Sequence, residues 1–180
     1  RRAVSGRVGA VLAAAVLVLS LSCAPEAADA PPPGRARIQG VPFFPQEDFQ
    51  CGPASLAGVL AFHGLDATPE ALAAEVFRPD IRGSLGLDMA LAARKRGLSA
   101  RFYEGSATDL ARGLNQGLPL VLLLDLGLGP VHRLHFVVAT GFGPEGVILN
   151  SDQDQGRTVA WPEFLAQWNK TGRWTLWIER

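Results

Sequence analysis

The sequence predicts an α+β domain, in which several helices come before a mainly antiparallel sheet. Two observations support this prediction. Between residues 51 and 117, apolar stretches of helical length end at Gly64, Gly97 and Gly117. From residue 119 onward, the chain changes to short apolar runs separated by turn residues, which is typical of strands joined by hairpins.

The first expected helix spans residues 54–63 and carries apolar side chains on nearly every face, which indicates a buried helix. Pro53 suits its first turn, and Gly64 suits its end. Residues 41–45, ahead of this helix, are expected to form an extended strand, because the two prolines in this stretch disfavour helix in the residues before them.

The later elements follow from the same signals in chain order. Thr68 opens the second helix as its N-cap, and Gly97 and Gly117 close the third and fourth helices. The expected helices after the first are 68–77, 87–96, 106–116 and 162–168, and the expected strands are 98–103, 119–126, 135–140, 147–150, 158–161 and 174–178, with a turn at 143–146.

Composition excludes several classes of function. The 180 residues carry 17 Lys and Arg against 17 Asp and Glu, so the formal net charge is zero, and we expect no nucleic-acid partner. A hydrophobic fraction of 48% excludes a disordered chain. Two cysteines and three scattered histidines supply neither a disulfide framework nor a metal site, so no cofactor is expected.

The first 23 residues have the layout of a secretion signal. Three arginines precede a run of 14 apolar and small residues at 8–21, which as a helix would be about 21 Å long and therefore short for a bilayer core of about 30 Å. Cys23 follows this run and resembles the lipidated cysteine of bacterial lipoproteins, although Ser20 stands where that motif has Leu. An ordinary cleaved signal and an uncleaved anchor remain alternatives.

This leader implies an exported bacterial protein in the periplasm, attached to a membrane through a lipid on Cys23. We expect the signal at 1–23, a proline-rich linker at 24–38 and the folded domain at 39–180. The choice between inner and outer membrane stays open, as does the oligomeric state.

Cys51 is the candidate nucleophile, because the partial positive charge of a helix N-terminus favours a thiolate there. Such chemistry also needs a base. His63 lies about three turns away along the same helix, and His132 falls in a loop. His135 opens an apolar strand, either as the base or as an exposed strand end. A disulfide with Cys23 and a buried inert thiol are the alternatives for Cys51.

Two blocks of the sequence resemble a known family. Residues 41–46 (VPFFPQ) and 51–56 (CGPASL) are similar to the start of the papain-like peptidases that trim double-glycine leaders from bacteriocin precursors. Residues 135–150 resemble the histidine-bearing hairpin of that family, and the whole resemblance covers about residues 40–178. It implies a papain-like cysteine peptidase fold, in which a buried helix carrying Cys51 packs on an antiparallel sheet carrying His135.

The resemblance also implies roles. Cys51 matches the nucleophile, His135 the general base, and Gln46 the side-chain donor of the oxyanion hole, for which Gln50 is the competing candidate. The family places an Asp in a slot that falls near Ser151 here, so the residue that orients His135 is expected to be Asp152, with Asn150 or neither as alternatives.

The implied activity is a thiol peptidase that hydrolyses a peptide bond through an acyl-enzyme, with a peptide or protein as substrate. Two alternatives belong to other classes. One is a papain-like acyl transferase or transpeptidase, and the other is an inactive peptide-binding module whose third triad residue has drifted.

Overall fold

The computed structural model describes residues 30–46 and 49–180. The signal at 1–23, including Cys23, and the first residues of the expected linker lie outside the described residues. In chain order the elements are β1 (Ala36–Arg37), α1 (Cys51–Phe62), α2 (Pro69–Val76), β2 (Phe77–Arg78), β3 (Gly83–Ser84), α3 (Gly86–Lys95), β4 (Ser99–Glu104), α4 (Ala107–Asn115), β5 (Leu120–Asp125), β6 (Leu134–Gly143), β7 (Gly146–Ser151), β8 (Asp154–Val159), α5 (Trp161–Asn169) and β9 (Trp174–Glu179).

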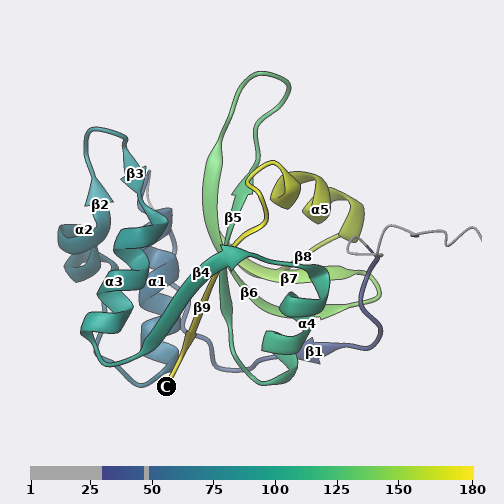
Figure 1. Ribbon diagram of the computed structural model, residues 1–180, viewed down its shortest axis with the longest axis horizontal. Coiled ribbons are helices and arrows are strands. Elements are labelled where there is room, and N and C mark those ends of the chain that lie inside the picture. The colour runs from purple at the N-terminus through teal and green to yellow at the C-terminus, as the bar shows by residue number, and fades with distance from the viewer. Residues whose placement is uncertain (1–29, 47–48) are drawn as a thin grey trace, which may run out of the picture.

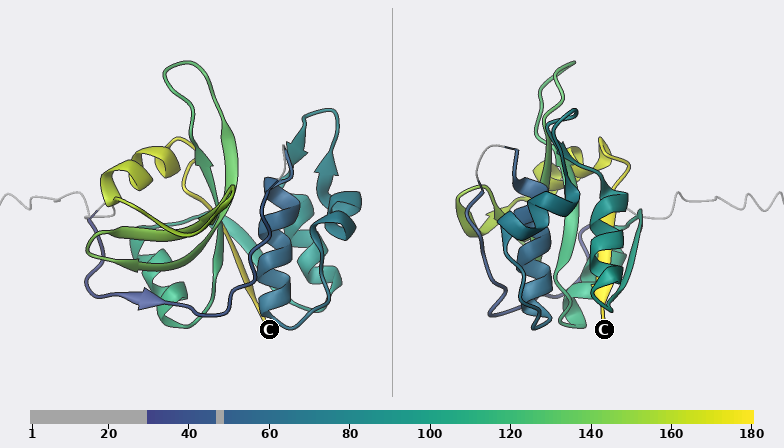
Figure 2. Two further views of the ribbon diagram at one scale, coloured as in Figure 1. Left: turned by 180° about the vertical axis from the view of Figure 1, so that it is seen from behind. Right: turned by 90° about the vertical axis from the view of Figure 1, so that its left-hand side faces the viewer.

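The main sheet is antiparallel throughout, in the order β4-β9-β5-β6-β7-β8, with β1 added to β6. Helices α1, α2 and α3 gather on one side of this sheet, and α4 and α5 lie on the other (Figure 1). Figure 2 shows the same division from behind and from the side. The predicted α+β class is confirmed.

Alternation along the strands divides the core into two clusters. On β5, Val121 packs with α1, α2 and α3, whereas Leu120, Leu122 and Leu124 pack with α4 and α5. On β6, Val138 belongs to the first cluster and its neighbours Val137 and Ala139 to the second. The sheet is thus buried on both faces, which explains why β5 and β6 read as nearly continuous apolar runs.

The predicted burial of helix α1 is observed: nine of its twelve residues, 52–60, are buried. Close packing also requires small residues: a Cβ at Gly52 would lie 2.4 Å from Ser84 Oγ, and one at Gly58 would lie 2.7 Å from the carbonyl oxygen of Pro42. The helix therefore lies tightly between the chain that precedes it and the β2–β3 ribbon, which fixes the position of Cys51 at its first turn.

The structure corrects the sequence prediction in two places in the first half of the chain. Residues 41–45 form no strand, and the short strand β1 pairs with β6 instead. Prolines lack the N–H that a sheet ladder needs, so residues 41–45 run past α1 without pairing. The β2–β3 ribbon was not predicted, because two-residue strands leave no periodic signal.

Two strands extend by several residues beyond their predicted bounds. Strand β6 continues to Gly143 through a register shift between Ala139 and Gly141, and β8 begins at Asp154 rather than at residue 158. The added part of β8 is polar and mostly exposed, so it lacked the apolar pattern on which the prediction relied. The prediction of Thr68 as an N-cap holds, and the structure adds a complete capping box of Ser106 with Asp109 at the start of α4.

Candidate active site

Cys51 is the first residue of α1 and carries a free thiol. Burial raises the pKa of this thiol above its ordinary value, and the negative charge of Asp152 adds to the rise. Backbone hydrogen bonds involving Phe136 and Gly52 lower the pKa, but burial outweighs them. The sequence predicted a thiolate at the helix N-terminus. In the structure, the cost of burying the anion favours the neutral thiol before substrate binds.

His135 stands near the start of β6, opposite Leu124 of β5, and is buried. Its Nε2 lies 3.3 Å from Asp152 Oδ1 and 3.1 Å from Ser151 Oγ. Burial lowers the pKa of the imidazole, and Arg133 lowers it further, whereas the carboxylate of Asp152 raises it. The ring is therefore held neutral by its surroundings and oriented through Nε2.

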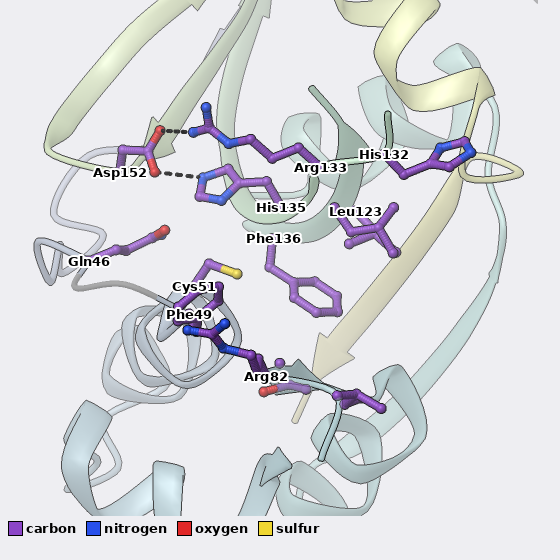
Figure 3. A pocket seen from close by; sticks show the side chains of 14 residues that line it. Gln46, Phe49, Cys51, Arg82, Leu123, His132, Arg133, His135, Phe136 and Asp152 are labelled. Carbon is purple, nitrogen blue, oxygen red and sulfur yellow. Dashed lines mark ion pairs between the residues drawn. The ribbon is translucent and has the colours of Figure 1, made fainter. Parts of the chain in front are cut away.

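The structure brings Cys51 and His135 into one place. Both line the same cavity, and the backbone of Phe136, the residue that follows His135, reaches the sulfur. In Figure 3 the imidazole lies above the thiol, with Asp152 to its upper left and Gln46 at the left. The helix and the sheet thus deliver the two side chains to a common point from positions 84 residues apart in sequence.

Asp152 reaches His135 because the chain turns directly after β7. Its backbone has φ of 51°, in the left-handed region that tight hairpin turns require and that Asp tolerates better than most residues. The turn brings the carboxylate to the side of His135. The alternation of side chains along β7 does not determine this placement, because Asp152 lies beyond the end of the strand.

Asn150 lies elsewhere. Its Oδ1 accepts a hydrogen bond of 2.9 Å from the backbone N–H of Gly156 in β8, and its side chain is buried there. The residue between them, Ser151, contacts the imidazole through its hydroxyl, a contact that sequence reasoning did not assign. The signal was present, since the family slot for the third residue fell near Ser151.

Gln46 is tied by its backbone to the turn that carries Asp152. Its N–H donates to the carbonyl oxygen of Asp152 at 2.9 Å, and its own carbonyl accepts from Gln153 Nε2 at 2.7 Å. Its side-chain Oε1 is buried without a hydrogen-bond partner among the described residues, so the amide is not fully committed to the protein. Gln46 lines the cavity with Cys51, whereas Gln50 is the N-cap residue of α1 and is absent from the lining.

The cavity has a volume of about 720 Å³ and lies between the helical side and the sheet. Two projections border it, the β2–β3 ribbon and the loop between β5 and β6, and Figure 1 shows both reaching beyond the same end of the molecule. Arg82 lies on one wall with its guanidinium 4.3 Å from the ring centre of Phe49. The lining residues are Gln46, Phe49, Cys51, Ile81, Arg82, Gly83, Ser84, Leu123, His132, Arg133, Leu134, His135, Phe136 and Asp152.

The other two histidines are placed differently. His63 is the C-cap residue of α1, and its Nε2 lies 3.2 Å from the carbonyl oxygen of Ile178. His132 borders the cavity, but its Nδ1 lies 2.6 Å from Asp125 Oδ2, and Figure 3 shows its ring pointing away from Cys51. Within residues 30–46 and 49–180, no three His, Cys, Asp or Glu side chains gather as a metal site. The same part of the chain contains no helix with the length and apolarity of a membrane span.

Comparison with known proteins matches nearly the whole folded part. The model of the Peptidase C39 like family matches residues 38–176. A C39-like peptidase structure from Bacillus anthracis covers 82% of this chain and 98% of its own, with a TM-score of 0.68 and 19% identity. The peptidase domain of Streptococcus ComA, a bifunctional ABC transporter of a quorum-sensing pathway, covers 78% and 98%, with a TM-score of 0.63 and 22% identity.

A third solved structure is closer in sequence. It is a double glycine motif protease from an AMS/PCAT transporter in complex with the leader peptide, and it shows 26% identity and a TM-score of 0.62 over 80% of this chain and 94% of its own. Among proteins with curated annotation, none matches the chain significantly. The structural matches confirm the fold that the sequence resemblance implied.

Proposed function

Because the chain belongs to the Peptidase C39 like family, we propose that it is a thiol peptidase that hydrolyses a peptide bond through an acyl-enzyme on Cys51. The observation that supports this proposal most directly is the convergence of Cys51, His135, Asp152 and Gln46 on one cavity. Three separate segments of the chain supply these side chains, and a purely structural role for each would not require them to meet.

In the proposed reaction, His135 acts as a general base during the attack. Nε2 faces Asp152 and Ser151, which leaves Nδ1 to take the proton from the thiol as sulfur bonds to the scissile carbonyl carbon. Since burial raises the pKa of Cys51 and lowers that of His135, both groups rest in the neutral form, and the proton moves only as the substrate reacts.

The remaining groups stabilise the charges that form. Asp152 carries the negative charge that favours the imidazolium, and the Gln46 amide with the Cys51 backbone N–H receives the oxyanion. The imidazolium then gives its proton to the departing amine, which breaks the C–N bond and leaves a thioester. A water molecule, deprotonated by His135, hydrolyses the thioester and restores the thiol.

For the substrate we propose a peptide cleaved after a double-glycine motif. The support is the likeness to a double glycine motif protease that was solved with its leader peptide. The cavity lining includes five aliphatic or aromatic residues, Phe49, Ile81, Leu123, Leu134 and Phe136, which suits a peptide that presents apolar side chains beside the scissile bond.

An electrophilic peptide probe tests the proposal. A peptide ending in Gly-Gly with a terminal aldehyde should label Cys51 stoichiometrically, and labelling should disappear in Cys51→Ala and fall strongly in His135→Ala. A probe that never labels Cys51 in folded protein would refute the peptidase and leave a binding module. Incubating substrate peptide with an added amine separates hydrolysis from acyl transfer, because a transferase yields the new amide instead of a free carboxylate.

We also propose that the protein is exported and lipid-anchored at Cys23, on the support of the leader pattern alone. Mass spectrometry of the mature N-terminus tests this. A diacylglyceryl cysteine at position 23 is expected, and an unmodified mature start at Ala24 or beyond would refute the anchor.

A further inference from the structure

The carboxylate of Asp152 has two partners, one on each oxygen. Oδ1 lies 3.3 Å from His135 Nε2, and Oδ2 lies 3.6 Å from a terminal nitrogen of Arg133 (Figure 3). The side chain of Asp152 is 49% exposed, while that of His135 is 7% exposed. A half-exposed carboxylate on a two-residue turn would otherwise rotate and hydrate freely, so a second partner matters for keeping it on the imidazole.

Arg133 reaches this position because the chain ahead of β6 is held in place. Its backbone N–H donates to Asp125 Oδ1 at 2.9 Å, and its carbonyl accepts from the N–H of Leu126 at 2.9 Å. Asp125 is buried and also accepts from the N–H of Gly127 at 2.9 Å. These bonds extend the β5–β6 pairing past the start of β6, so residues 133 and 135 project to the same side of the strand.

We propose that Arg133 is a positioning residue, which holds the carboxylate of Asp152 against Nε2 of His135 and so fixes the orientation of the imidazole. The proposal rests on the catalytic role proposed above for His135. Arg133 itself touches neither the thiol nor the place where a scissile bond would lie in any contact that the structure shows. Its charge also lowers the pKa of His135 directly, but its positioning effect passes through Asp152.

The other charged or titratable groups around the imidazole do not replace this contact. Cys51 approaches from α1, Arg82 lines the wall formed by the β2–β3 ribbon, and His132 is bound to Asp125. Among the described residues, the only ion pairs recorded for Asp152 are those with Arg133 and His135. Loss of the guanidinium would therefore leave one oxygen of the carboxylate to solvent.

The test compares Arg133→Met and Arg133→Gln with Arg133→Lys in the full chain. Arg157→Met is the matched control, because Arg157 forms an exposed pair with Asp154 at 3.8 Å on the same hairpin without contacting Asp152. The first readout is the downfield NMR resonance of the His135 Nε2–H, which persists only while its hydrogen bond slows exchange with water. The second is kcat and KM for a Gly-Gly peptide substrate.

In the neutral variants the Nε2–H resonance should broaden or disappear. Their kcat should fall about fivefold with little change in KM, because a fivefold loss corresponds to the upper range of the free energy of one exposed ion pair. Arg133→Lys should retain most of both, and Arg157→Met should match the wild type. Folded neutral variants that keep the resonance, or that keep wild-type kcat, would overturn the proposal. The NMR readout needs no turnover, so it still tests Arg133 if the chain proves not to be a peptidase.

Discussion

Replacing Asp152 with Asn tests most directly whether this residue orients His135, the proposed general base. The change removes the negative charge 3.3 Å from His135 Nε2 and keeps the size of the side chain. Because the carboxylate is 49% exposed, we take an effective dielectric of about 40–80, at which two unit charges at this distance attract by roughly 1.3–2.5 kcal/mol. That attraction acts on the imidazolium formed during attack, so kcat should fall about tenfold to seventyfold.

The pH dependence of this variant has a defined sign. Asp152 raises the pKa of His135, so its removal lowers that pKa further. Since the base must be neutral to accept a proton, the acidic limb of kcat/KM should move to lower pH in Asp152→Asn while the plateau falls. Stopped assays of Gly-Gly peptide cleavage at a series of pH values measure both effects.

Asn150→Ala is the control for this experiment. Its amide binds Gly156 rather than the imidazole, so the substitution should leave kcat unchanged and lower the stability of the fold by about 1 kcal/mol. If Asn150→Ala costs more activity than Asp152→Asn, or if the acidic limb of Asp152→Asn moves to higher pH, the assignment of the orienting residue is refuted.

Three further outcomes follow from the site and its supports. Gln46→Ala should lower kcat about a hundredfold to a thousandfold, as loss of an oxyanion donor does, whereas Gln50→Ala should leave it nearly unchanged; equal losses in both would refute the choice of donor. Iodoacetamide should alkylate Cys51 slowly at neutral pH and faster as pH rises, because the pKa of the thiol is raised by burial; a fast, pH-independent reaction in mildly acidic buffer would indicate a preformed thiolate instead. Hydrogen bonds from His132, Arg133 and Gly127 hold the pKa of Asp125 well below its usual range, so its contribution to stability is present above about pH 4 and is lost as pH falls below that; thermal melts of Asp125→Asn should therefore show a weaker loss of stability in acid than the wild type.

Much of the fold could be predicted from the sequence, because the longer elements carry strong periodic and capping signals. Helix α4 begins at a capping box and ends before Gly117, and β5 reads as an apolar run that ends at Asp125. The elements that were not predicted bury few apolar side chains. Strand β1, the β2–β3 ribbon and the polar half of β8 exist because neighbouring chain pairs with them, and this is a tertiary effect without a local pattern.

The site could be anticipated only in part, for a similar reason. Cys51 and His135 stand at the ends of predictable elements, so both could be singled out from local sequence. The placing of Asp152 against His135 depends on a left-handed turn after β7, and one residue of difference in that turn would have presented another side chain. The direction of the pKa shift of Cys51 could not be predicted from the sequence either. The helix N-terminus favours a thiolate, but burial of the side chain, which the sequence does not give, raises the pKa of the thiol.

One junction joins the two halves of the proposed machinery. The backbone N–H of Gln46 donates to the carbonyl oxygen of Asp152, and the side chain of Gln153 donates to the Gln46 carbonyl, so two hydrogen bonds join Gln46 to the β7–β8 turn. Gln46, the proposed oxyanion donor, and Asp152, the proposed orienting residue, are therefore coupled through these hydrogen bonds. A displacement of the β7–β8 turn would therefore move Gln46 and Asp152 together relative to the sulfur of Cys51. This coupling explains how a short exposed turn can serve a site that needs its groups placed within a fraction of an ångström.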